Sequence, residues 1–497
     1  MVGKVFGIAT LSEFRLETRK ALQAFARHLG AVEVRADLFP EVEPDRIHEV
    51  FSGVVIWTLR SRREGGSGPD FPEKRKTLIL EAAARFDWID LEVERDLVPE
   101  ILAAIEPDRR VLSWHGTAAD SDELYERWQE MAKWPARCYK LVVHAQRPGE
   151  TCLPFELLLT LTPQERAKTV SFAMGSEGVW TRLLAPRIGA PYLYGYLGER
   201  PAASGQLSWE RLFRDYGFPD LLPASTLFGV VGSPVLHSLS PRLHNAGYRA
   251  QGISAFFVPF ETTSFSDFWL DVVESGWFDR MGLPLRGLAV TTPFKELAVA
   301  VAGAVSPLAD QIEAANSLVF QDGVWEADTT DGEGVVGAVR ARGVSLAGRT
   351  ALVLGVGGAG RAAAVGLSRR GACVEVTNRD PDRGRQIANR LRVSYRPFAE
   401  LDWKRYSLVV NATPLGRSLS DPHPAPLELL SPNAVLVDLV YGEEETGWLR
   451  EARQRGFLAI DGREVLLYQA RPQFERMTGQ ELPLDLGREL LGLGGER

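Results

Sequence analysis

The first 215 residues alternate short apolar segments with amphipathic ones, and this repeat limits the possible fold more than any other feature of the chain. The apolar segments predict strands over Val5–Thr10, Ala31–Asp37, Gly53–Arg60, Trp88–Val93, Arg110–His115, Arg137–Val143, Thr169–Met174 and Tyr192–Tyr196. Helical periodicity lies between them, for example over Glu13–His28 and Ser121–Lys133. Eight strands, each followed by a helix, predict an α/β fold of the (β/α)8 or TIM-barrel type. A doubly wound open sheet is the alternative, although it normally has fewer strands.

A lysine lies in the middle of the sixth predicted strand. Lys140 belongs to the run A-R-C-Y-K-L-V-V (136–143), where a charge is costly unless it is paired or used. The chain has nine lysines among its 57 basic residues, so arginine is its usual cation. Only the lysine amine can lose its proton near neutral pH and form a Schiff base. On this strand alone, a snorkelling or ion-paired structural lysine is equally open.

Polar residues collect at the carboxyl ends of the predicted strands, where barrel enzymes place their active sites. Glu33, Arg35 and Asp37 alternate along the second strand and therefore share one face. Any one of these residues could be an ordinary surface ion pair. Seven strands with polar residues at one end are harder to attribute to chance. The others in this set are Arg60, Glu64, Asp90, Glu92, His115, Arg182 and Gln206.

The ordered motifs of this half resemble those of type I 3-dehydroquinate dehydratase. They are E-V-R-A-D (33–37), R-S-x-x-E-G-G (60–66), I-D-L-E (89–92), S-W-H (113–115), the strand with Lys140, and G-Q (205–206). The resemblance implies that Lys140 forms an imine with the substrate ketone and that His115 acts as general base and then acid. It also implies that Arg60 and Arg182 hold a carboxylate, and that Glu33, Arg35, Glu64 and Gln206 orient the reacting groups. Ala202 departs from the family, which usually has Ser or Thr there.

At 497 residues the chain is too long for one core, and its periodicity breaks near residue 215. Residues 214–226 contain two prolines and a glycine, which predict a short, stiff connection. We expect a barrel over 1–215, a linker over 216–226, a substrate lobe over 227–333 with 471–497, and a Rossmann lobe over 334–470. A C-terminal helix at 471–491 is expected to pack onto the substrate lobe.

The stretch 349–379 has the pattern of a dinucleotide site. A strand T-A-L-V-L (350–354) runs into G-V-G-G-A-G (355–360), a helix and a second strand (373–377), the context that makes this fingerprint credible. The second strand is followed by Asn378, Arg379 and Arg383, which favour the 2′-phosphate of NADP, although Asp380 between them weakens that argument. The predicted cofactor-binding residues are Gly355, Val356, Gly357, Gly358, Ala359, Asn378, Arg379, Arg383 and Gly462.

Together with its flanking motifs, residues 227–497 resemble shikimate dehydrogenase. The motifs include S-L-S-P (238–241), where Pro241 would start a helix just after the two serines, A-V-T-T-P-F-K-E (289–296), A-A-N-S-L (314–318) and A-D-T-T-D-G-E-G (327–334). The resemblance implies substrate binding by Ser238, Ser240, Thr291, Asn316, Asp331, Tyr441 and Gln469, with Lys295 and Asp331 as the catalytic pair. Ala289, Thr329 and Val465-Leu466 depart from the family pattern but leave that pair intact.

The two resemblances fit each other, because the product implied for the barrel is the substrate implied for the second half. We therefore predict a bifunctional enzyme that converts 3-dehydroquinate to 3-dehydroshikimate and reduces this to shikimate with NADPH. One alternative is an NAD-dependent enzyme that oxidises quinate or shikimate, which the residues from 378 to 383 disfavour. Another is a non-catalytic regulator derived from the same pair, which the presence of all four catalytic candidates disfavours.

The bulk composition limits the partners. A net charge of -8 and a pI near 5.6 disfavour nucleic-acid binding. Three cysteines without metal-ligand spacing predict no metal site and a reducing, cytoplasmic environment. No apolar run is long enough for a membrane span, and the chain enters a strand almost at once, leaving no room for a signal peptide. The sequence does not distinguish a monomer from a homo-oligomer.

Overall fold

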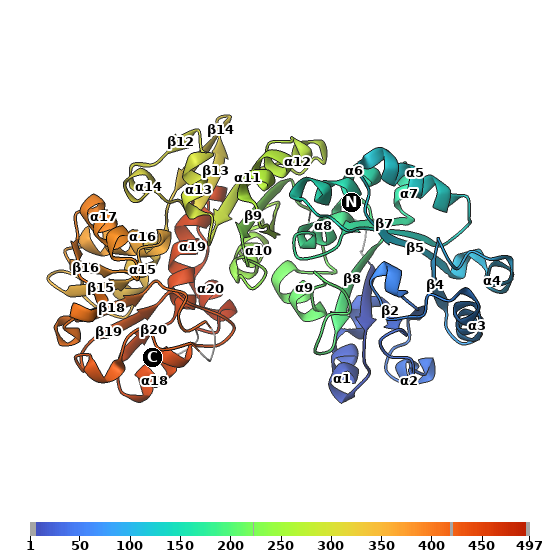
Figure 1. Cartoon of the computed structure of the whole chain (residues 1–497), viewed down its shortest axis with the longest axis horizontal. Helices are drawn as coiled ribbons and strands as arrows, with labels where there is room; N and C mark the ends of the chain where they lie inside the picture. Colours follow the sequence, from blue (N-terminus) through green and yellow to red (C-terminus); the bar gives the residue numbers. More distant parts are fainter. Residues whose placement is uncertain (1–5, 222, 418–420, 494–497) are drawn as a thin grey trace. The chain divides into compact units, whose positions relative to one another are not determined.

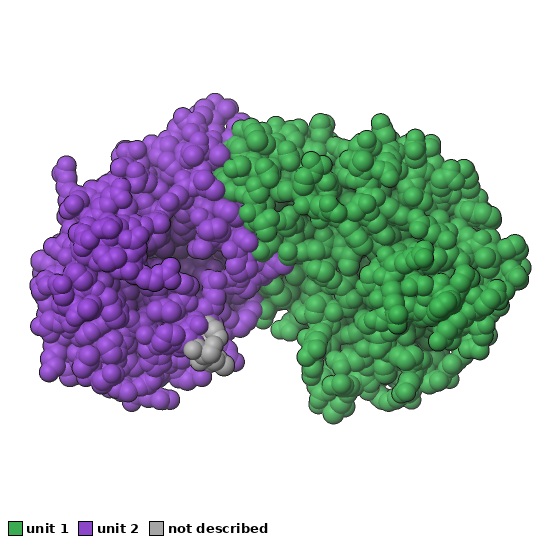
Figure 2. All heavy atoms as spheres, in the orientation of Figure 1, with its two compact units in different colours: residues 1–225, 258–284 green, residues 226–257, 285–497 purple. Residues whose placement is uncertain are grey.

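The computed structural model describes residues 6–221, 223–417 and 421–493. They form two compact units, which Figure 2 colours separately. Unit 1 comprises residues 1–225 and 258–284, and unit 2 comprises residues 226–257 and 285–497. The segment 258–284 therefore groups with the barrel residues, although it follows them in the chain. The domain boundaries expected from the sequence remain predictions.

Eight parallel strands form the sheet of unit 1, which confirms the predicted barrel topology (Figure 1). They are β1 (Phe6–Leu11), β2 (Leu29–Arg35), β3 (Val54–Thr58), β4 (Trp88–Glu92), β5 (Arg110–Gly116), β6 (Cys138–Val143), β7 (Thr169–Ala173) and β8 (Tyr192–Leu197). The order is β8-β1-β2-β3-β4-β5-β6-β7, so β8 and β7 are the two ends of the ladder. The loops that follow these end strands are joined by a hydrogen bond from Gly175 N to Ser204 O, 3.3 Å long.

Helices connect the strands of unit 1, and several begin with proline at a position where the missing N–H costs nothing. They are α1 (Leu16–Phe25), α2 (Pro44–His48), α3 (Pro72–Ala83), α4 (Pro99–Ala104), α5 (Ser121–Ala132), α6 (Leu153–Thr160), α7 (Pro163–Arg166), α8 (Val179–Leu184) and α9 (Trp209–Tyr216). The segment 258–284 adds α11 (Phe265–Phe268), a π-helical turn over Trp269–Val273 and α12 (Trp277–Arg280).

Side chains of alternate strand residues fill the barrel, as the period of two requires. An apolar layer closes the interior, and polar residues follow it towards the carboxyl ends of the strands. The buried members of this layer are Ile8, Ala31, Ile56, Val111, Cys138, Val142, Val170, Phe172 and Tyr194. Lys140 lies two residues beyond Cys138 on β6, opposite Ser113 of β5 and Val170 of β7. Three members of this layer, Val142, Phe172 and Tyr194, also line the pocket beside the polar residues.

A mixed sheet forms the first part of unit 2. Its strands are β9 (Thr226–Gly232), β11 (Leu285–Val290), β12 (Ala304–Val305), β13 (Ser317–Gln321) and β14 (Val324–Asp328), together with β10 (Ala255–Glu261), whose residues from Val258 onward group with unit 1. From β9 onward the order is β9-β11-β13-β14-β12, and the ladders β11–β13 and β13–β14 are antiparallel. Three helices belong to this part: α10 (Ser240–Gln251), α13 (Lys295–Ala300) and α14 (Pro307–Ile312).

A fully parallel sheet of the Rossmann type follows, as the sequence predicts. Its order is β17-β16-β15-β18-β19-β20, with β15 (Thr350–Leu354), β16 (Cys373–Thr377), β17 (Ser394–Tyr395), β18 (Leu408–Asn411), β19 (Val435–Asp438) and β20 (Leu458–Ile460). The helices are α15 (Asp331–Ala341), α16 (Gly358–Ser368), α17 (Pro381–Leu391) and α18 (Gly447–Gln454). The glycine-rich turn 355–357 thus connects β15 directly to α16.

The C-terminal helix differs from the prediction of one helix over 471–491, which is wrong. Two helices are present, α19 (Gly462–Thr478) and α20 (Leu484–Leu490). Gly479 ends α19 in the left-handed conformation (φ 70°), which glycine adopts without strain. Pro472 lies inside α19 without ending it. Helix α19 contacts β11, β13 and α15, so one helix touches both parts of unit 2.

Among the described residues, no helix is both long and apolar enough to cross a membrane.

Two candidate active sites

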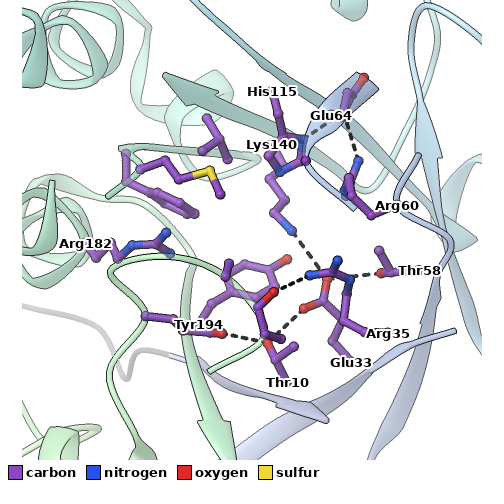
Figure 3. A pocket seen from close by; sticks show the side chains of 17 residues that line it. Thr10, Glu33, Arg35, Thr58, Arg60, Glu64, His115, Lys140, Arg182 and Tyr194 are labelled. Atoms are coloured by element: carbon purple, nitrogen blue, oxygen red, sulfur yellow. Dashed lines mark hydrogen bonds and ion pairs between the residues drawn. The ribbon is translucent and has the colours of Figure 1, made fainter. Parts of the chain in front are cut away.

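A pocket opens at the carboxyl ends of the unit 1 strands, and all eight residues predicted for this half line it (Figure 3). These residues come from six different strands and the loops that follow them. They are Glu33, Arg35, Arg60, Glu64, His115, Lys140, Arg182 and Gln206. Thr10, Thr58, Phe172, Met174, Tyr194 and Ala202 also line the pocket and were not predicted as functional.

Lys140 is buried at the base of this pocket, 6% exposed. Its Nζ donates one long hydrogen bond to Glu33 Oε1 (3.3 Å) and lies 3.8 Å from Asp90 Oδ2. Glu33 also accepts hydrogen bonds from the hydroxyls of Thr10 (2.8 Å) and Thr58 (3.0 Å). Burial alone would raise the pKa of Glu33, but Lys140, Arg35 and the Thr10 hydroxyl lower it to about 2. Lys140 is therefore held beside a permanent carboxylate without being tightly bound by it.

His115 and Glu64 form a second pair in the pocket wall. His115 Nδ1 lies 2.8 Å from Glu64 Oε2. Burial and the positive charges of Arg60 and Lys140 lower the pKa of His115 well below its usual value. Burial also raises the pKa of Glu64 to about 8, against the opposing charge of Arg60. A neutral imidazole with Nδ1 engaged leaves Nε2 as the nitrogen that can take a proton from a substrate.

Arg60 and Arg182 differ in how many of their donors are occupied. The buried Arg60 guanidinium donates to Glu64, Ser113 and Asp90 at 2.9–3.0 Å and to Glu92 at 3.3 Å. Arg182 donates to Ser204 O (3.3 Å) and lies over the Phe172 ring, while its buried Nε has no partner among the described residues. Burial lowers the pKa of Arg182 to about 9. Arg182 therefore has the spare donors that a substrate carboxylate requires.

Ala202 stands where the family usually has a hydroxyl, yet its backbone is used. Arg35 donates from one terminal nitrogen to Ala202 O (2.8 Å) while a bidentate pair with Asp37 fixes its guanidinium (2.8 Å for both bonds). The loop after β8 is thus tied to β2 through the main chain.

Unit 2 has a larger cavity between its two sheets, and fifteen of the predicted residues line it. They are Ser238, Ser240, Thr291, Lys295, Asn316, Asp331, Gly355, Val356, Gly357, Ala359, Asn378, Arg379, Tyr441, Gly462 and Gln469. The other two predicted residues lie elsewhere. Gly358 begins α16 against the Lys295 side chain, and Arg383 pairs with Glu296 Oε1 at 2.8 Å.

Lys295 and Asp331 are in direct contact in this cavity, with Lys295 Nζ donating to Asp331 Oδ2. Asn316 Nδ2 donates to the other carboxylate oxygen (2.9 Å) and to Gln469 Oε1 (2.8 Å). The backbone N–H of Thr330 donates to Asn316 Oδ1 (2.8 Å), which fixes the direction of the amide. The predicted catalytic pair and two predicted substrate residues thus form one hydrogen-bonded group.

Only the first of the two serines, Ser238, precedes α10. Ser240 is the first residue of that helix, and its N–H donates to Ser238 Oγ (3.2 Å). The expectation that both serines precede the helix was therefore wrong for Ser240. Tyr441 lies near Ser238 in the same cavity, and burial raises the pKa of its phenol.

The cofactor end of the cavity has the geometry of a phosphate site. Gly355 adopts φ 93° in the turn, and a Cβ on Gly360 would come within 2.1 Å of Gly355 O, so the tight turn requires glycine at both positions. The turn leads into the N-terminus of α16, whose free N–H groups favour an anion. Asp380, which weakened the sequence argument for NADP, caps α17 by accepting from the N–H groups of Asp382 and Arg383.

The ion pairs of the buried acidic residues are the main feature that the sequence does not show. Glu92, 1% exposed, accepts from Arg60 and from Ser61 N (2.7 Å) and lies 3.4 Å from Arg75. The alternation of Asp90 and Glu92 with apolar neighbours on β4 was visible in the sequence and indicated inward-facing carboxylates. Over the described residues, no cluster of His, Cys, Asp or Glu could hold a metal ion.

The folds and sites define the class: a barrel with a lysine-centred polar pocket, joined to a Rossmann-type dehydrogenase. Two family models match, Type I 3-dehydroquinase over residues 10–220 and Shikimate dehydrogenase substrate binding domain over residues 230–318. The chain belongs to the shikimate dehydrogenase family through its second half and carries a type I 3-dehydroquinase barrel before it.

Individual relatives agree with this assignment. A shikimate dehydrogenase (NADP(+)) of Methanothrix thermoacetophila is 39% identical over 264 residues, which are 52% of this chain and 94% of the relative. A chloroplastic bifunctional 3-dehydroquinate dehydratase/shikimate dehydrogenase of Arabidopsis thaliana is 27% identical over 514 residues, covering 96% of this chain and 82% of the relative. The crystal structure of shikimate dehydrogenase from Aquifex aeolicus matches with a TM-score of 0.50 and 30% identity, over 55% of this chain and 99% of that structure.

Replacing Glu92 by alanine should destabilise the barrel strongly. The change removes one acceptor from Arg60, Ser61 N and Arg75 together and leaves the two buried arginines with one counter-ion fewer. We expect the free energy of unfolding to fall by about 3–5 kcal/mol, measured by denaturant titration. The matched control is Glu94→Ala, which removes an exposed pair with Arg127 and should change the same free energy by less than about 1 kcal/mol. Similar losses for both variants would contradict the proposed importance of the buried network.

Proposed function

We propose that the chain catalyses two consecutive reactions of the shikimate pathway, dehydration of 3-dehydroquinate and reduction of 3-dehydroshikimate to shikimate. The observation that carries this proposal is that the proposed catalytic residues of each half line one cavity: Lys140 with His115 in unit 1, and Lys295 with Asp331 in unit 2. The relatives' names connect these cavities to the two reactions.

In the barrel, the neutral amine of Lys140 attacks the substrate ketone, and loss of water gives an imine. The protonated imine withdraws electrons from the neighbouring carbon, so a proton there becomes removable. His115 takes this proton through Nε2 and returns it to the hydroxyl that leaves as water. Hydrolysis of the imine then releases the product and restores the lysine. Arg182, with donors to spare, is the better candidate to hold the substrate carboxylate, because Arg60 is occupied by buried acids.

In unit 2, the substrate lies against Ser238, Thr291 and Tyr441, with its ketone at Lys295. Bound NADPH supplies the hydride. Lys295 delivers the proton to the new hydroxyl oxygen, and Asp331 orients the ammonium and keeps it charged. Asn316 and Gln469 fix Asp331 in turn, so the proton donor is positioned before the substrate arrives.

The choice of NADP over NAD rests on Arg379, which lines the cavity beyond β16. Its guanidinium can pair with a 2′-phosphate, while Oδ1 of Asp380 already accepts two hydrogen bonds as the cap of α17. Arg379 therefore favours NADP and disfavours the alternative of an NAD-dependent enzyme that oxidises quinate or shikimate. The three cysteines are free, which supports action in the reducing cytoplasm. The partners proposed are small molecules, with no nucleic acid.

Substituting Lys140 by alanine should separate the two reactions. We expect the variant to lose dehydration of 3-dehydroquinate by at least about 1,000-fold, since no other group supplies the imine, while reduction of added 3-dehydroshikimate stays at the parent rate. Both are followed by NADPH absorbance, the first as a coupled assay. Lys133→Ala, which removes an exposed lysine of α5's C-terminus, is the control and should leave both rates unchanged. Retained dehydration in Lys140→Ala, or borohydride-fixed substrate on another lysine, would refute the assignment.

Substituting Arg379 by alanine should weaken use of NADPH selectively. A charged hydrogen bond of about 1.5–3 kcal/mol corresponds to a loss of about 10- to 100-fold in kcat/KM for NADPH, with little change for NADH. Steady-state kinetics with both cofactors measure this. Arg383→Ala is the comparison, because Arg383 pairs with Glu296 and should lose less. Equal losses with NADPH and NADH would remove the support for 2′-phosphate recognition by Arg379.

A further inference from the structure

The ring of Tyr194 lies directly beside the reactive amine of the barrel. Lys140 Nζ is 4.4 Å from the centroid of this ring, and Figure 3 shows the two side chains close together among the residues that line the pocket. We propose that Tyr194 is a positioning residue for the dehydratase, whose ring face holds the nitrogen of Lys140 while that nitrogen is positively charged. The inference rests on the proposed imine chemistry and adds a residue to it.

Hydrogen bonds alone do not hold this amine. An ammonium has three N–H donors, and Lys140 uses one of them in a 3.3 Å bond to Glu33, with Asp90 more distant at 3.8 Å. When the imine forms, the nitrogen keeps a single N–H, so any hydrogen-bonded positioning is largely lost. A ring face attracts the positive charge itself and does not depend on the number of protons. Tyr194 can therefore hold the ammonium and the protonated imine in the same place.

The ring is suited to this task because it is fixed and neutral. Tyr194 belongs to the apolar layer of the barrel, together with Ile8 and Cys138, and is 5% exposed. Burial, with the nearby Cys138, Glu33 and Asp90, raises the pKa of Tyr194 well above its usual value, so the phenol stays protonated. The attraction accordingly comes from the ring quadrupole, and the hydroxyl is not required for it.

The contrast with Lys295 supports a special arrangement at Lys140. Lys295 donates directly to a carboxylate oxygen of Asp331, as suits a group that delivers a proton to the substrate. Lys140 must lose its proton to attack, and a short carboxylate contact would oppose that loss. An aromatic face stabilises the cation moderately without accepting its proton.

The test compares Tyr194→Phe, which keeps the ring, with Tyr194→Leu and Tyr194→Met, which fill similar apolar volume without it. We expect Tyr194→Phe to retain the parent rate of 3-dehydroquinate dehydration within about 2-fold. The two ring-less variants should lose about 5- to 30-fold in kcat, as a desolvated cation–π contact predicts. Reduction of 3-dehydroshikimate by the same samples should be unchanged, which reports correct folding of unit 2, and near-UV circular dichroism reports packing in the barrel.

A pH profile separates positioning from a merely structural effect. The rate of borohydride trapping of the substrate is measured against pH for each variant. Loss of the ring favours the neutral amine over the ammonium, so the midpoint of trapping should move to lower pH by up to about one unit. The groups that face this amine and can titrate or carry charge are Glu33, Asp90, Cys138, His115, Arg60 and Arg182, and all are unchanged in every variant.

The outcomes are distinct. A lower rate with a shifted midpoint in Tyr194→Leu and Tyr194→Met, and neither in Tyr194→Phe, supports the proposal. Parent-like rates in the ring-less variants, a lower rate with an unshifted midpoint, or equal loss in Tyr194→Phe would each overturn it. Failure of the proposed function itself looks different, because the parent chain would then show no dehydration and no trapped lysine at any pH.

Discussion

Burying charged side chains costs free energy, and this cost determines how the residues of the barrel site must be arranged. Arg60 lies among Glu64, Asp90 and Glu92 with almost no exposure, and each of these groups would be strongly destabilising alone. Because every charge there needs its partners in place, the strands that carry them must keep their register. The pocket is therefore positioned by the same network that fixes β3, β4 and the loop after β3, and the reactive lysine stands on a rigid base.

The two lysines show how different surroundings prepare the same side chain for different chemistry. Lys140 stands above the apolar layer of the barrel, beside Glu33, whose oxygens are already shared with two threonine hydroxyls, and 3.8 Å from Asp90. Lys295 stands at the start of a short helix, in contact with an aspartate that an amide network orients. The two lysines therefore differ in what surrounds the amine: a long hydrogen bond and an aromatic ring at Lys140, and a direct contact with an oriented carboxylate at Lys295.

The sequence predicts much of this architecture because its signals are local. The eight strands and the glycine-rich turn follow from periodicity and short motifs, and the motifs that carry the two family resemblances include many of the residues that line the pockets. The errors arise where a side chain's partner is distant in sequence or where helix ends are decided by single residues. Arg60 lines the pocket and its role in substrate binding stays a prediction, but the sequence does not show that Asp90 and Glu92 occupy its donors. Gly479 divides the predicted C-terminal helix, and Asp380 turns out to cap a helix.

The contact between Arg35 and the carbonyl oxygen of Ala202 has a consequence for how this pocket can vary. Every residue type offers a backbone carbonyl, so the anchoring of the loop after β8 is independent of the side chain at position 202. Selection can then change that side chain to adjust what touches the ligand, without moving the loop. The position of the loop after β8 therefore does not depend on which side chain position 202 presents to the pocket. Alanine at this position is compatible with a loop that keeps its place.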